Sequence, residues 1–502
     1  MAAYKLPNSD PEIDPVTVIG GGPAGLTAAW ELARNGRRSL VLEGSGVMGG
    51  ISQTAQHKGY RFDLGGHRFF TKVGYVQELW EEILGEEFLV RPRLSRIHYR
   101  GVLFDYPLRP VNALLGLGPL EACRVVASYL KARMQPIRDE RSFEDWVVNR
   151  FGRRLFEIFF KTYTEKVWGI PCSEIGADWA AQRIKNLDLE RAVWNALFGR
   201  FKKTDVTSLI EEFHYPRFGP GQMWESCAAG LEAAGGEVRR GAPVIGMEFD
   251  GARLAALRIK SDDGEDERHE VGECISSMAL RDLVLCAGEA APQAVREAAD
   301  RLRYRDFLTV ALVVERPDLF PDNWIYIHSK EVHVGRIQNF KNWSPDLVPD
   351  PAHSTLGLEY FVHEGDELWT APDSELIELA RKEVAALDLA PADAVLDGAV
   401  LRVRKAYPVY DEHYSDAVET IRGWVDSIPN LQSVGRNGQH RYNNQDHSMM
   451  TGVLAARNLM GEQHDIWAVN VEQDYHEEGR STGSSGATGD RLVPARIGAS
   501  AE

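Results

Sequence analysis

The sequence predicts an α/β fold, and three observations support that prediction. A β-branched run at residues 16–19 ends in a glycine-rich turn, and a helical pattern begins directly after it. Residues from 107 to about 205 have mainly helical periodicity. Residues 305–410 contain several alternating apolar and polar runs, as antiparallel strands do. We therefore expect a sheet domain of the nucleotide-binding kind, an inserted helical domain and a further domain built on a mainly antiparallel β-sheet.

The turn after the first strand carries Gly20, Gly22 and Gly25, with the spacing of a dinucleotide-binding loop. Gly20 lets the chain turn tightly, Gly22 lets the backbone approach a pyrophosphate, and Gly25 lets the helix pack close to the strand. The helix that follows directs free N–H groups and the positive end of its dipole towards the phosphates. The sequence therefore predicts a Rossmann-like dinucleotide-binding domain.

Further residues favour FAD as the dinucleotide. The second strand, at residues 38–43, ends in Glu43, which suits the ribose diol of FAD or NAD and would repel the extra phosphate of NADP. Gly49 and Gly50 follow, and a second glycine pair that includes Gly66 lies beside an aromatic cluster. A large flavin needs close approach of the backbone at several points, so this combination predicts a Rossmann-like FAD-binding domain.

Length and charge narrow the class of protein. The chain has 502 residues, enough for two or three domains, and a formal net charge of −17. This charge argues against nucleic acid or anionic membranes as partners, and an anionic substrate would need a local arginine cluster.

The five cysteines show no CxxC spacing, so we expect no metal site. No apolar run is long enough to span a bilayer and the N-terminus has no signal-peptide core, so we expect a cytoplasmic protein.

The pattern along the chain also predicts domain boundaries. A discontinuous FAD-binding domain is expected from residues 15–105, 217–300 and 425–465. Residues 106–216 form the predicted helical domain and residues 301–424 the predicted β-sheet domain. Residues 477–502 are low in apolar side chains, and we expect them to be disordered. Individual elements are expected as core strands at 273–278 and 431–436, paired strands within 237–260, sheet strands at 307–314 and 356–362, and a helix at 449–460.

Several motifs outside the glycine loop resemble those of UDP-galactopyranose mutases in order and in most spacings. They extend from residue 16 to about 460 and comprise the segments at 65–70, 106–107, 163–171, 179–183, 336–345 and 435–448. The resemblance implies the three-part fold given above and an isomerase of carbohydrate biosynthesis, which interconverts the pyranose and furanose rings of a nucleotide sugar. In that family the flavin must be reduced, its N5 acts as nucleophile at the anomeric carbon, and the reaction has no net redox change.

The resemblance assigns Arg183 and Arg336 to the diphosphate of the substrate. A leaving diphosphate gains charge and must be stabilised, and the guanidinium fork suits phosphate better than an ammonium group does. For an isolated arginine a surface salt bridge would be the better interpretation, but here the flanking motifs match as well. Tyr326, Tyr407 and Tyr442 match tyrosines that converge on the phosphates, where a phenol donates a hydrogen bond without adding charge. A buried tyrosine bonded to a carbonyl is the competing interpretation, and it weighs equally for Tyr326.

Two further residues complete the catalytic set that the resemblance implies. Trp168 resembles the tryptophan that packs near the sugar, and core packing is the alternative. His67 matches a histidine whose loop lies against the flavin ring, and an ordinary loop histidine is the alternative. Arg436, Gln445 and Asp446 fall where the last helix of the family meets the flavin.

The substrate-binding residues implied by the resemblance are Tyr106, Arg109, Tyr163, Thr164, Trp343 and Asn444. Tyr106 fits the nucleotide-base site, and Tyr163 and Thr164 lie about one turn before Trp168, where they could face the same cavity. The chain departs from the family at Arg109, where eukaryotic members have a glutamine, and at Asn444, where bacterial members have an aspartate. An arginine at 109 could read a different base or reach an extra anionic group. The segment before residue 213 also lacks a family asparagine, so the sugar and the base are left open.

Two other functions compete with the mutase hypothesis. A true FAD-dependent oxidoreductase of the amine-oxidase or protoporphyrinogen-oxidase kind, acting on a small organic substrate, would have a mainly apolar pocket and no need of paired arginines. A flavin-binding regulatory protein would not need so many polar residues converging on one site. The leading prediction is therefore an FAD-dependent mutase that binds a nucleotide-diphosphate sugar. NAD(P)H is compatible with the sequence as the external reductant, because Glu43 bears only on the FAD site. A homo-oligomer is also compatible with the sequence.

Overall fold

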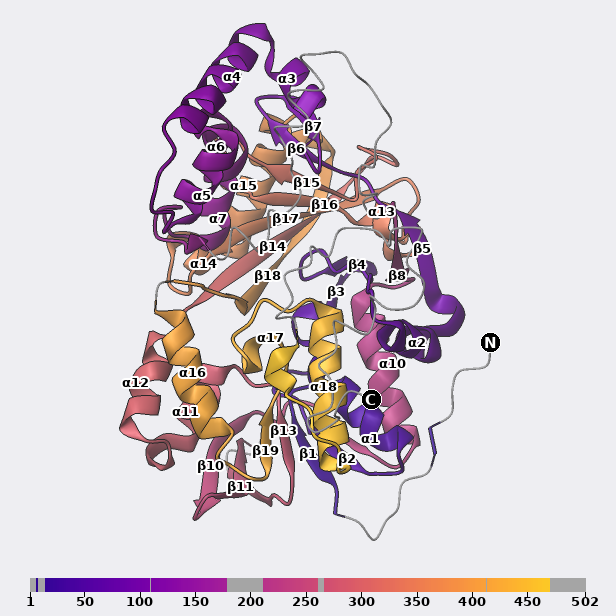
Figure 1. Ribbon diagram of the computed structural model, residues 1–502. Helices are drawn as coiled ribbons and strands as arrows, with labels where there is room; N and C mark the ends of the chain where they lie inside the picture. The colour runs from indigo at the N-terminus through magenta and orange to yellow at the C-terminus, as the bar shows by residue number, and fades with distance from the viewer. Residues whose placement is uncertain are drawn as a thin grey trace.

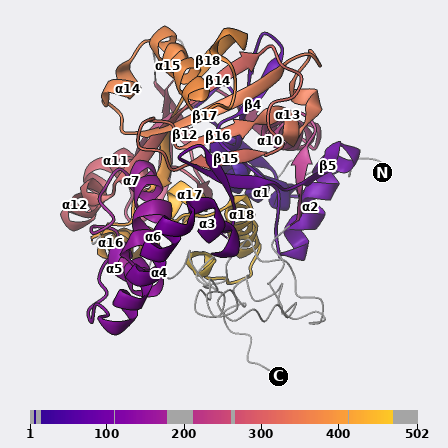
Figure 2. The same ribbon diagram turned by 90° about the horizontal axis from the view of Figure 1, so that it is seen from above.

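The computed structural model describes residues 6–7, 14–108, 110–177, 211–260, 266–411 and 413–469. Figures 1 and 2 show the described chain arranged around a small sheet, at the bottom of Figure 1, and a large sheet above it. Helices cover the small sheet and lie beside the large one. This combination of helices with a parallel and a mainly antiparallel sheet confirms the predicted α/β fold.

The small sheet is five-stranded, wholly parallel and assembled from segments far apart in sequence. Its strand order is β19-β13-β1-β2-β9. The strands are β1 (Val16–Ile19), β2 (Ser39–Leu42), β9 (Glu237–Arg239), β13 (Cys274–Ser276) and β19 (Leu431–Ser433). Parallel sheets are covered on both faces, and β1, β2 and β13 are buried along their whole length. The core strands predicted at 16–19, 38–43 and 273–278 are therefore confirmed. The strand predicted at 431–436 is confirmed over 431–433, whereas residues 435 and 436 begin a short helix.

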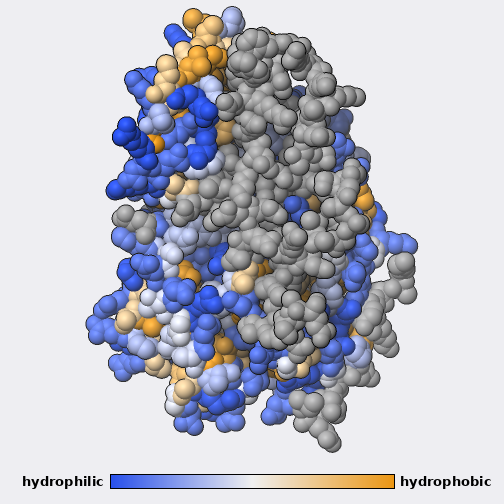
Figure 3. Space-filling model, viewed as in Figure 1, coloured by the Kyte–Doolittle hydropathy of each residue, from blue (hydrophilic) through white to orange (hydrophobic). Residues whose placement is uncertain are grey.

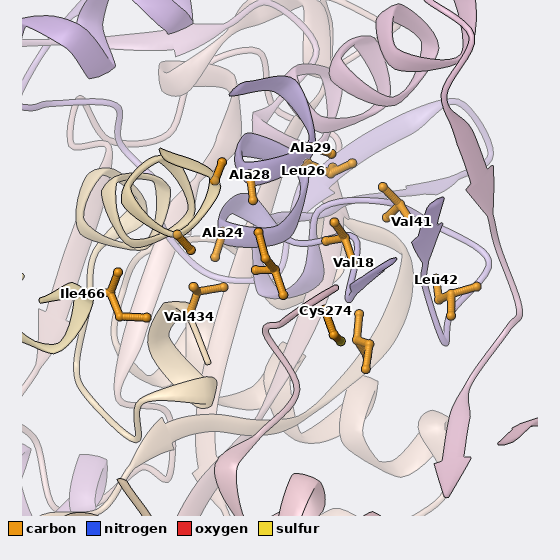
Figure 4. Close-up of a cluster of buried hydrophobic side chains, with 14 of the residues drawn as sticks. Val18, Ala24, Leu26, Ala28, Ala29, Val41, Leu42, Cys274, Val434 and Ile466 are labelled. Atoms are coloured by element: carbon orange, nitrogen blue, oxygen red, sulfur yellow. The ribbon is translucent and has the colours of Figure 1, made fainter. Parts of the chain in front are cut away.

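Three helices pack around this sheet: α1 (Pro23–Arg34), α10 (Pro220–Ala233) and α18 (Gln445–Leu459). Helix α1 begins at Pro23, because proline is pre-set for the first helical position and lacks the N–H that would be unpaired there. Figure 4 shows apolar side chains of α1 gathered with Val18 and Val41 of the first two strands and with Val434 near the C-terminal end. One core thus joins the two ends of the described chain, and α18 confirms the helix predicted at 449–460.

The rest of the lower part surrounds this core. An antiparallel sheet of three strands turns first at Gly251, which confirms the paired strands predicted within 237–260. Its strands are β10 (Val244–Asp250), β11 (Arg253–Lys260) and β12 (Asp266–Glu270). The neighbouring helices are α2 (Gly74–Leu84), α11 (Leu280–Ala287), α12 (Gln293–Arg301), α16 (Tyr414–Val425) and α17 (Gly435–Gly438). Two small antiparallel pairs lie between the lower and upper parts: β3 (Thr54–His57) with β4 (Tyr60–Asp63), and β5 (Phe88–Pro92) with β8 (Glu212–Pro216).

The large sheet has seven strands in the order β18-β14-β17-β16-β15-β6-β7. All neighbours are antiparallel except β15 and β6, so the prediction of a mainly antiparallel sheet is confirmed. Its strands are β6 (Ser95–Tyr99), β7 (Val102–Asp105), β14 (Tyr304–Val314), β15 (Trp324–Ile327), β16 (Arg336–Asn339), β17 (Ser354–Val362) and β18 (Val395–Pro408). The first two come from the range 15–105, which the sequence assigned to the FAD-binding domain, because β6 completes the hydrogen bonding of β15. The short helices α13 (Phe340–Trp343) and α14 (Glu367–Thr370) and the longer α15 (Asp373–Ala386) connect these strands.

The helical part lies beside the large sheet, at the top and left of Figure 1. It comprises α3 (Pro110–Leu117), α4 (Pro119–Met134), α5 (Phe143–Phe151), α6 (Arg153–Phe156), a π-helical segment (Glu157–Lys161) and α7 (Thr162–Trp168). Helix α5 begins at a capping box in which the Ser142 hydroxyl and the Asp145 carboxylate each bond the other's backbone N–H. Figure 3 shows apolar atoms gathered at the top of the molecule, over α3 and α4. Leu115 on α3 and Leu120 and Met134 on α4 are exposed large apolar side chains.

Within the described ranges, no helix combines the length and apolar character that crossing a membrane requires. The same part of the chain brings no three His, Cys, Asp or Glu side chains together in a way that could hold a metal ion.

Candidate active site

The turn between β1 and α1 has no room for a side chain at Gly20 or at Gly25. Gly20 has a φ of +100°, and a Cβ there would lie 2.1 Å from the Ser277 hydroxyl oxygen. A Cβ at Gly25 would lie 2.0 Å from the carbonyl oxygen of Gly20, so only glycine lets the helix approach the turn. The N-cap residue, Gly22, has no side chain that could occupy the first N–H groups of α1. These groups are therefore available to a phosphate.

A second glycine turn faces the first one across a narrow gap. A Cβ at Gly22 would lie 3.8 Å from the Cα of Gly50, and one at Gly50 would lie 3.4 Å from the Cα of Gly22. Glu43, at the end of β2, accepts hydrogen bonds from the N–H of Gly21 at 2.6 Å and of Ser45 at 2.8 Å. A carboxylate has about four acceptor positions, so Glu43 keeps capacity for a ribose hydroxyl.

Two half-buried side chains near α17 and α18 have polar atoms without a partner in the described structure. Both polar side-chain atoms of Gln445 are buried and unbonded, as are Nε and Nη2 of Arg436. Buried polar groups are rarely left unsatisfied, and those that are indicate a group that binds there. Together with the two glycine turns and Glu43, these groups form a cradle that fits a dinucleotide carrying a polar ring system, as FAD does.

A row of polar side chains crosses the large sheet. Tyr326 on β15 pairs in register with Arg336 on β16, which pairs with Glu359 on β17. Glu359 in turn lies opposite Thr309 on β14. Because residues directly opposite each other point to the same face, the register of three strand pairs brings these side chains together.

Arg336 and Glu359 form an ion pair in which two guanidinium nitrogens bind one oxygen. Nε and Nη2 of Arg336 lie 2.8 and 2.6 Å from Oε2 of Glu359, while Gln338 donates to Oε1 at 2.8 Å. The Glu359 side chain is fully buried and that of Arg336 is 18% exposed. Burial alone would lower the pKa of Arg336, but Glu359, Tyr407 and Tyr163 outweigh it and hold that pKa well above its usual value. Arg336 is thus a permanent cation whose side chain keeps some access to solvent.

Three aromatic residues from different elements meet next to this pair. Tyr407 on β18 stacks on Tyr442 with 5.7 Å between ring centroids, and the Trp168 ring lies 6.3 and 6.2 Å from these two rings. The guanidinium of Arg436 lies over both tyrosine rings, at 4.8 and 4.2 Å. Burial raises the pKa of Tyr407, so its phenol stays protonated at neutral pH. The structure therefore brings together the predicted residues Trp168, Tyr407, Tyr442 and Arg436.

A second aromatic group continues from Tyr326. The ring of Tyr326 lies 4.7 Å from Tyr106 and 5.3 Å from Tyr163. Tyr163 stacks in parallel on His328 at 5.1 Å, and burial raises its pKa well above the usual value. Tyr106, Tyr163 and Tyr326, which the sequence placed in one site, thus lie together, and the ring of Tyr326 contacts the other two.

The loop that carries Gly65 and Gly66 lies against Arg336. A Cβ at Gly65 would lie 3.9 Å from Nη2 of Arg336, and one at Gly66 would lie 2.6 Å from the Gln338 amide. His67 hydrogen-bonds the Leu64 carbonyl through Nε2 at 3.1 Å. Burial, together with the nearby charges of Arg436 and Arg336, lowers the pKa of His67 to about 4, so its imidazole is neutral. The predicted flavin loop and the predicted diphosphate arginine are therefore neighbours.

Other predicted residues have different surroundings. Trp343 is 1% exposed, packs on Phe213 and Trp324, and donates its N–H to the Asn323 carbonyl, so it contributes core packing beside the site. Asn444 is exposed and forms the N-cap of α18. Thr164 is buried on α7, Asp446 is buried on α18, and Gly49 has a φ of +113° beside Trp224. Arg183 and Arg109 lie outside the described residues, as does the predicted tail at 477–502, so their roles stay predictions.

Sequence reasoning missed Glu359, the partner of Arg336. Its signal was a single acidic residue inside the strand Ser354–Val362, which is buried at every position. Charged side chains are almost never fully buried unless they are paired, so that residue pointed to a buried cation opposite it. Thr309 was also missed, because only the strand register brings it to this row. Gln338 was missed because its side-chain hydrogen bond to Glu359 crosses from β16 to β17.

Comparison with known proteins places the chain in a family. The model of the family described as flavin containing amine oxidoreductase matches residues 23–457. Pseudooxynicotine dehydrogenase from Pseudomonas sp is 46% identical over 68 residues, which are 13% of this chain and 13% of that protein. A probable UDP-galactopyranose mutase from Klebsiella pneumoniae is 24% identical over 204 residues, which are 39% of this chain and 52% of that protein. The chain thus matches about half or less of the length of these curated relatives.

Solved structures show the same fold. The crystal structure of reduced UDP-galactopyranose mutase superposes with a TM-score of 0.77 at 23% identity, covering 89% of this chain and 94% of that one. The family match spans most of the chain and implies FAD, and the cradle around Gly22, Glu43, Arg436 and Gln445 fits that cofactor. The chain therefore belongs to the family of flavin containing amine oxidoreductases.

Proposed function

We propose that the protein is an FAD-dependent nucleotide-sugar mutase. It interconverts the pyranose and furanose forms of a substrate of the UDP-galactose type without net redox change. The observation that carries this proposal is Arg336, a half-buried cation held by Glu359 beside the flavin loop and surrounded by Tyr163, Tyr326 and Tyr407. Such a group suits a diphosphate, which is anionic and takes hydrogen bonds from phenols.

The cofactor would be held by the residues of the cradle. The loop from Gly20 to Gly25 and the start of α1 suit the pyrophosphate, Glu43 suits the ribose, and Arg436 and Gln445 suit the polar ring edge. When bound and reduced, FAD supplies a nucleophilic nitrogen in this site.

The side chains of the site would stabilise the leaving diphosphate. Arg336 binds it through Nη1, the one guanidinium nitrogen that Glu359 does not engage, and Glu359 keeps the guanidinium in place. Tyr407 donates a hydrogen bond and adds no charge, because burial keeps its phenol protonated. Arg183 is proposed as a second diphosphate arginine. Local cations are required here, because the chain as a whole carries a charge of −17 and repels anions.

An oxidoreductase acting on an amine is the second candidate, favoured by the family match and by the dehydrogenase among the relatives. The charges of the site argue against it. An ammonium substrate would meet the positive charges of Arg336 and Arg436, and the rings of Tyr407 and Tyr442 already carry the Arg436 guanidinium.

The two candidates differ in the mass of the product. We expect the purified flavoprotein, reduced with dithionite, to convert UDP-galactose into a product of unchanged mass, and to do so only when reduced. The same preparation, oxidised and in air, is then offered amines and porphyrinogens. Consumption of oxygen with loss of two hydrogens from such a substrate, and no isomer from UDP-galactose, would overturn the proposal.

Arg336→Ala tests the diphosphate assignment. Turnover of UDP-galactose should fall below detection while FAD stays bound, because the cradle residues are untouched. Arg96→Ala is the matched control, since Arg96 also binds a fully buried carboxylate, that of Asp322, but from another strand of the sheet. Turnover of Arg336→Ala at the rate of the control would show that the assignment is wrong.

A further inference from the structure

The site is divided between a helix and a sheet. Tyr163, Thr164 and Trp168 lie on α7, whereas Arg336 and Tyr407 lie on β16 and β18. Helix α7 follows a π-helical segment, a form that is frequent at functional sites and alters the direction of the side chains beyond it. The geometry of the site therefore depends on how α7 is held against the sheet.

Arg305 connects the end of α7 to the sheet. It lies on β14 opposite Tyr407, and its side chain is 8% exposed. Its Nη2 donates to the Phe361 carbonyl at 2.7 Å and to the Lys166 carbonyl, in the last turn of α7, at 3.4 Å. That carbonyl has no partner within the helix, and the C-terminal end of a helix attracts a cation. A Cβ at Gly169 would lie 2.6 Å from Cζ of Arg305, so the guanidinium packs directly on the helix end.

Lys166 makes a second connection from the same turn. Its ammonium donates to the carbonyls of Ser329 and Val334 at 2.7 and 3.0 Å. These two residues belong to the connection between β15 and β16, directly before Arg336. The backbone carbonyl of Lys166 thus accepts a hydrogen bond from Arg305, while its ammonium group binds the connection that leads to Arg336.

We propose that Arg305 and Lys166 are positioning residues that lock α7 onto the large sheet. They set the placement of Trp168 and Tyr163 relative to Tyr407 and Arg336. The consequence for substrate rests on the proposed function, whereas the locking of the helix is a property of the chain and can be measured without substrate.

Hydrogen–deuterium exchange of the oxidised, FAD-bound protein tests the lock. In Arg305→Met and in Lys166→Met, exchange at residues 163–169 should be about tenfold faster or more, because each change removes charge-assisted hydrogen bonds. Arg402→Met is the matched control, since Arg402 on β18 donates in the same manner to the carbonyls of Trp369 and Ala371 at 2.9 and 2.7 Å. It should accelerate exchange near residues 369–371 and leave α7 at the wild-type rate.

The affinity for UDP distinguishes a positioning role of Arg305 and Lys166 from a general loss of protein stability. We expect Kd for UDP, measured by calorimetry, to rise about tenfold in both variants and to recover in part in Arg305→Lys, which keeps the charge and one donor. If Arg305→Met does not fold, the same two measurements on Lys166→Met test the proposal. Exchange of α7 in both variants equal to that in Arg402→Met would overturn the proposal. Faster exchange of α7 in a protein that binds no UDP would support the lock and count against the mutase instead.

Discussion

Replacing Glu359 with glutamine tests the energetics of the central ion pair. Arg336 donates to one oxygen of Glu359 from two nitrogens, and the carboxylate is fully buried. Glutamine keeps the size of the side chain and one acceptor oxygen but removes the negative charge. The guanidinium of Arg336, 18% exposed, then remains in the site without a counter-charge.

The magnitude follows from the separation and the burial of the charges. Two unit charges about 4 Å apart interact by about 4 kcal/mol at an effective dielectric constant near 20. Breaking a buried pair by removing one partner costs about 3–5 kcal/mol, and the remaining acceptor and the partial exposure of Arg336 reduce this. We expect Glu359→Gln to lower the free energy of unfolding by about 2–4 kcal/mol. The double variant that also carries Arg336→Met removes both charges. Its free energy of unfolding should be about equal to that of Glu359→Gln, or higher.

The assay is a double-mutant cycle in urea, followed by tryptophan fluorescence at pH 7. Arg404 and Glu364 supply the reference cycle, because their ion pair of 2.7 Å has side chains that are 66% and 57% exposed. We expect a coupling energy of about 2 kcal/mol or more between residues 336 and 359, against about 1 kcal/mol or less for the reference pair. Equal coupling in the two cycles would refute the reasoning, because the central pair would then behave as a solvated one.

Three further outcomes follow from the structure. Burial raises the pKa of Asp63 to about 7 against the hydrogen bonds from Tyr215 and Thr54, while the unfolded value is about 3.9. The folded protein therefore binds more protons between pH 4 and 7, so stability should fall as pH rises through that range, and thermal melts of Asp63→Asn should lose this dependence. Gly20→Ala should lower the flavin content of the purified protein, and should lower its free energy of unfolding by at least about 1 kcal/mol, because the new side chain combines a positive φ with a clash. Gly46→Ala is the control: its Cβ meets nothing within 4 Å, so its flavin absorbance and its melting temperature should match wild type. Since burial lowers the pKa of His67 to about 4, its imidazole proton signals in NMR spectra should not shift between pH 5.5 and 8, and a midpoint near 6.5 would contradict the described burial.

Local signals predicted the small sheet and its loop well. The β-branched run at 16–19 and the spacing of Gly20, Gly22 and Gly25 lie within ten residues of each other, so their structure depends on few distant contacts. Helix α18 was also predicted, because its buried middle contains a series of apolar residues that is visible in the sequence. The core strand at 431–433 was predicted as well, although Leu431 is its only apolar residue. The prediction of the large sheet was correct in kind, since alternation distinguishes strands from helices.

Pairing between distant strands could not be predicted in the same way. Nothing near residues 95–105 indicates that β6 joins β15, which lies more than 200 residues later. The pairing of Arg336 with Glu359 likewise depends on strand register, and a shift of one residue would turn Glu359 to the opposite face. The contact of Arg305 with the end of α7 has no counterpart in any local pattern.

The amino-acid sequence therefore determined the cofactor loop, the fold class and most side chains of the candidate site, because glycine spacing, periodicity and motif order are local properties of the chain. Only the tertiary structure decided which of these side chains meet. Strand register placed Tyr326, Arg336 and Glu359 in one row, and helix packing brought Trp168 to Tyr407 and Tyr442. The physical reason is that register and packing result from hydrogen bonding and burial across the whole molecule, which no single segment of sequence contains.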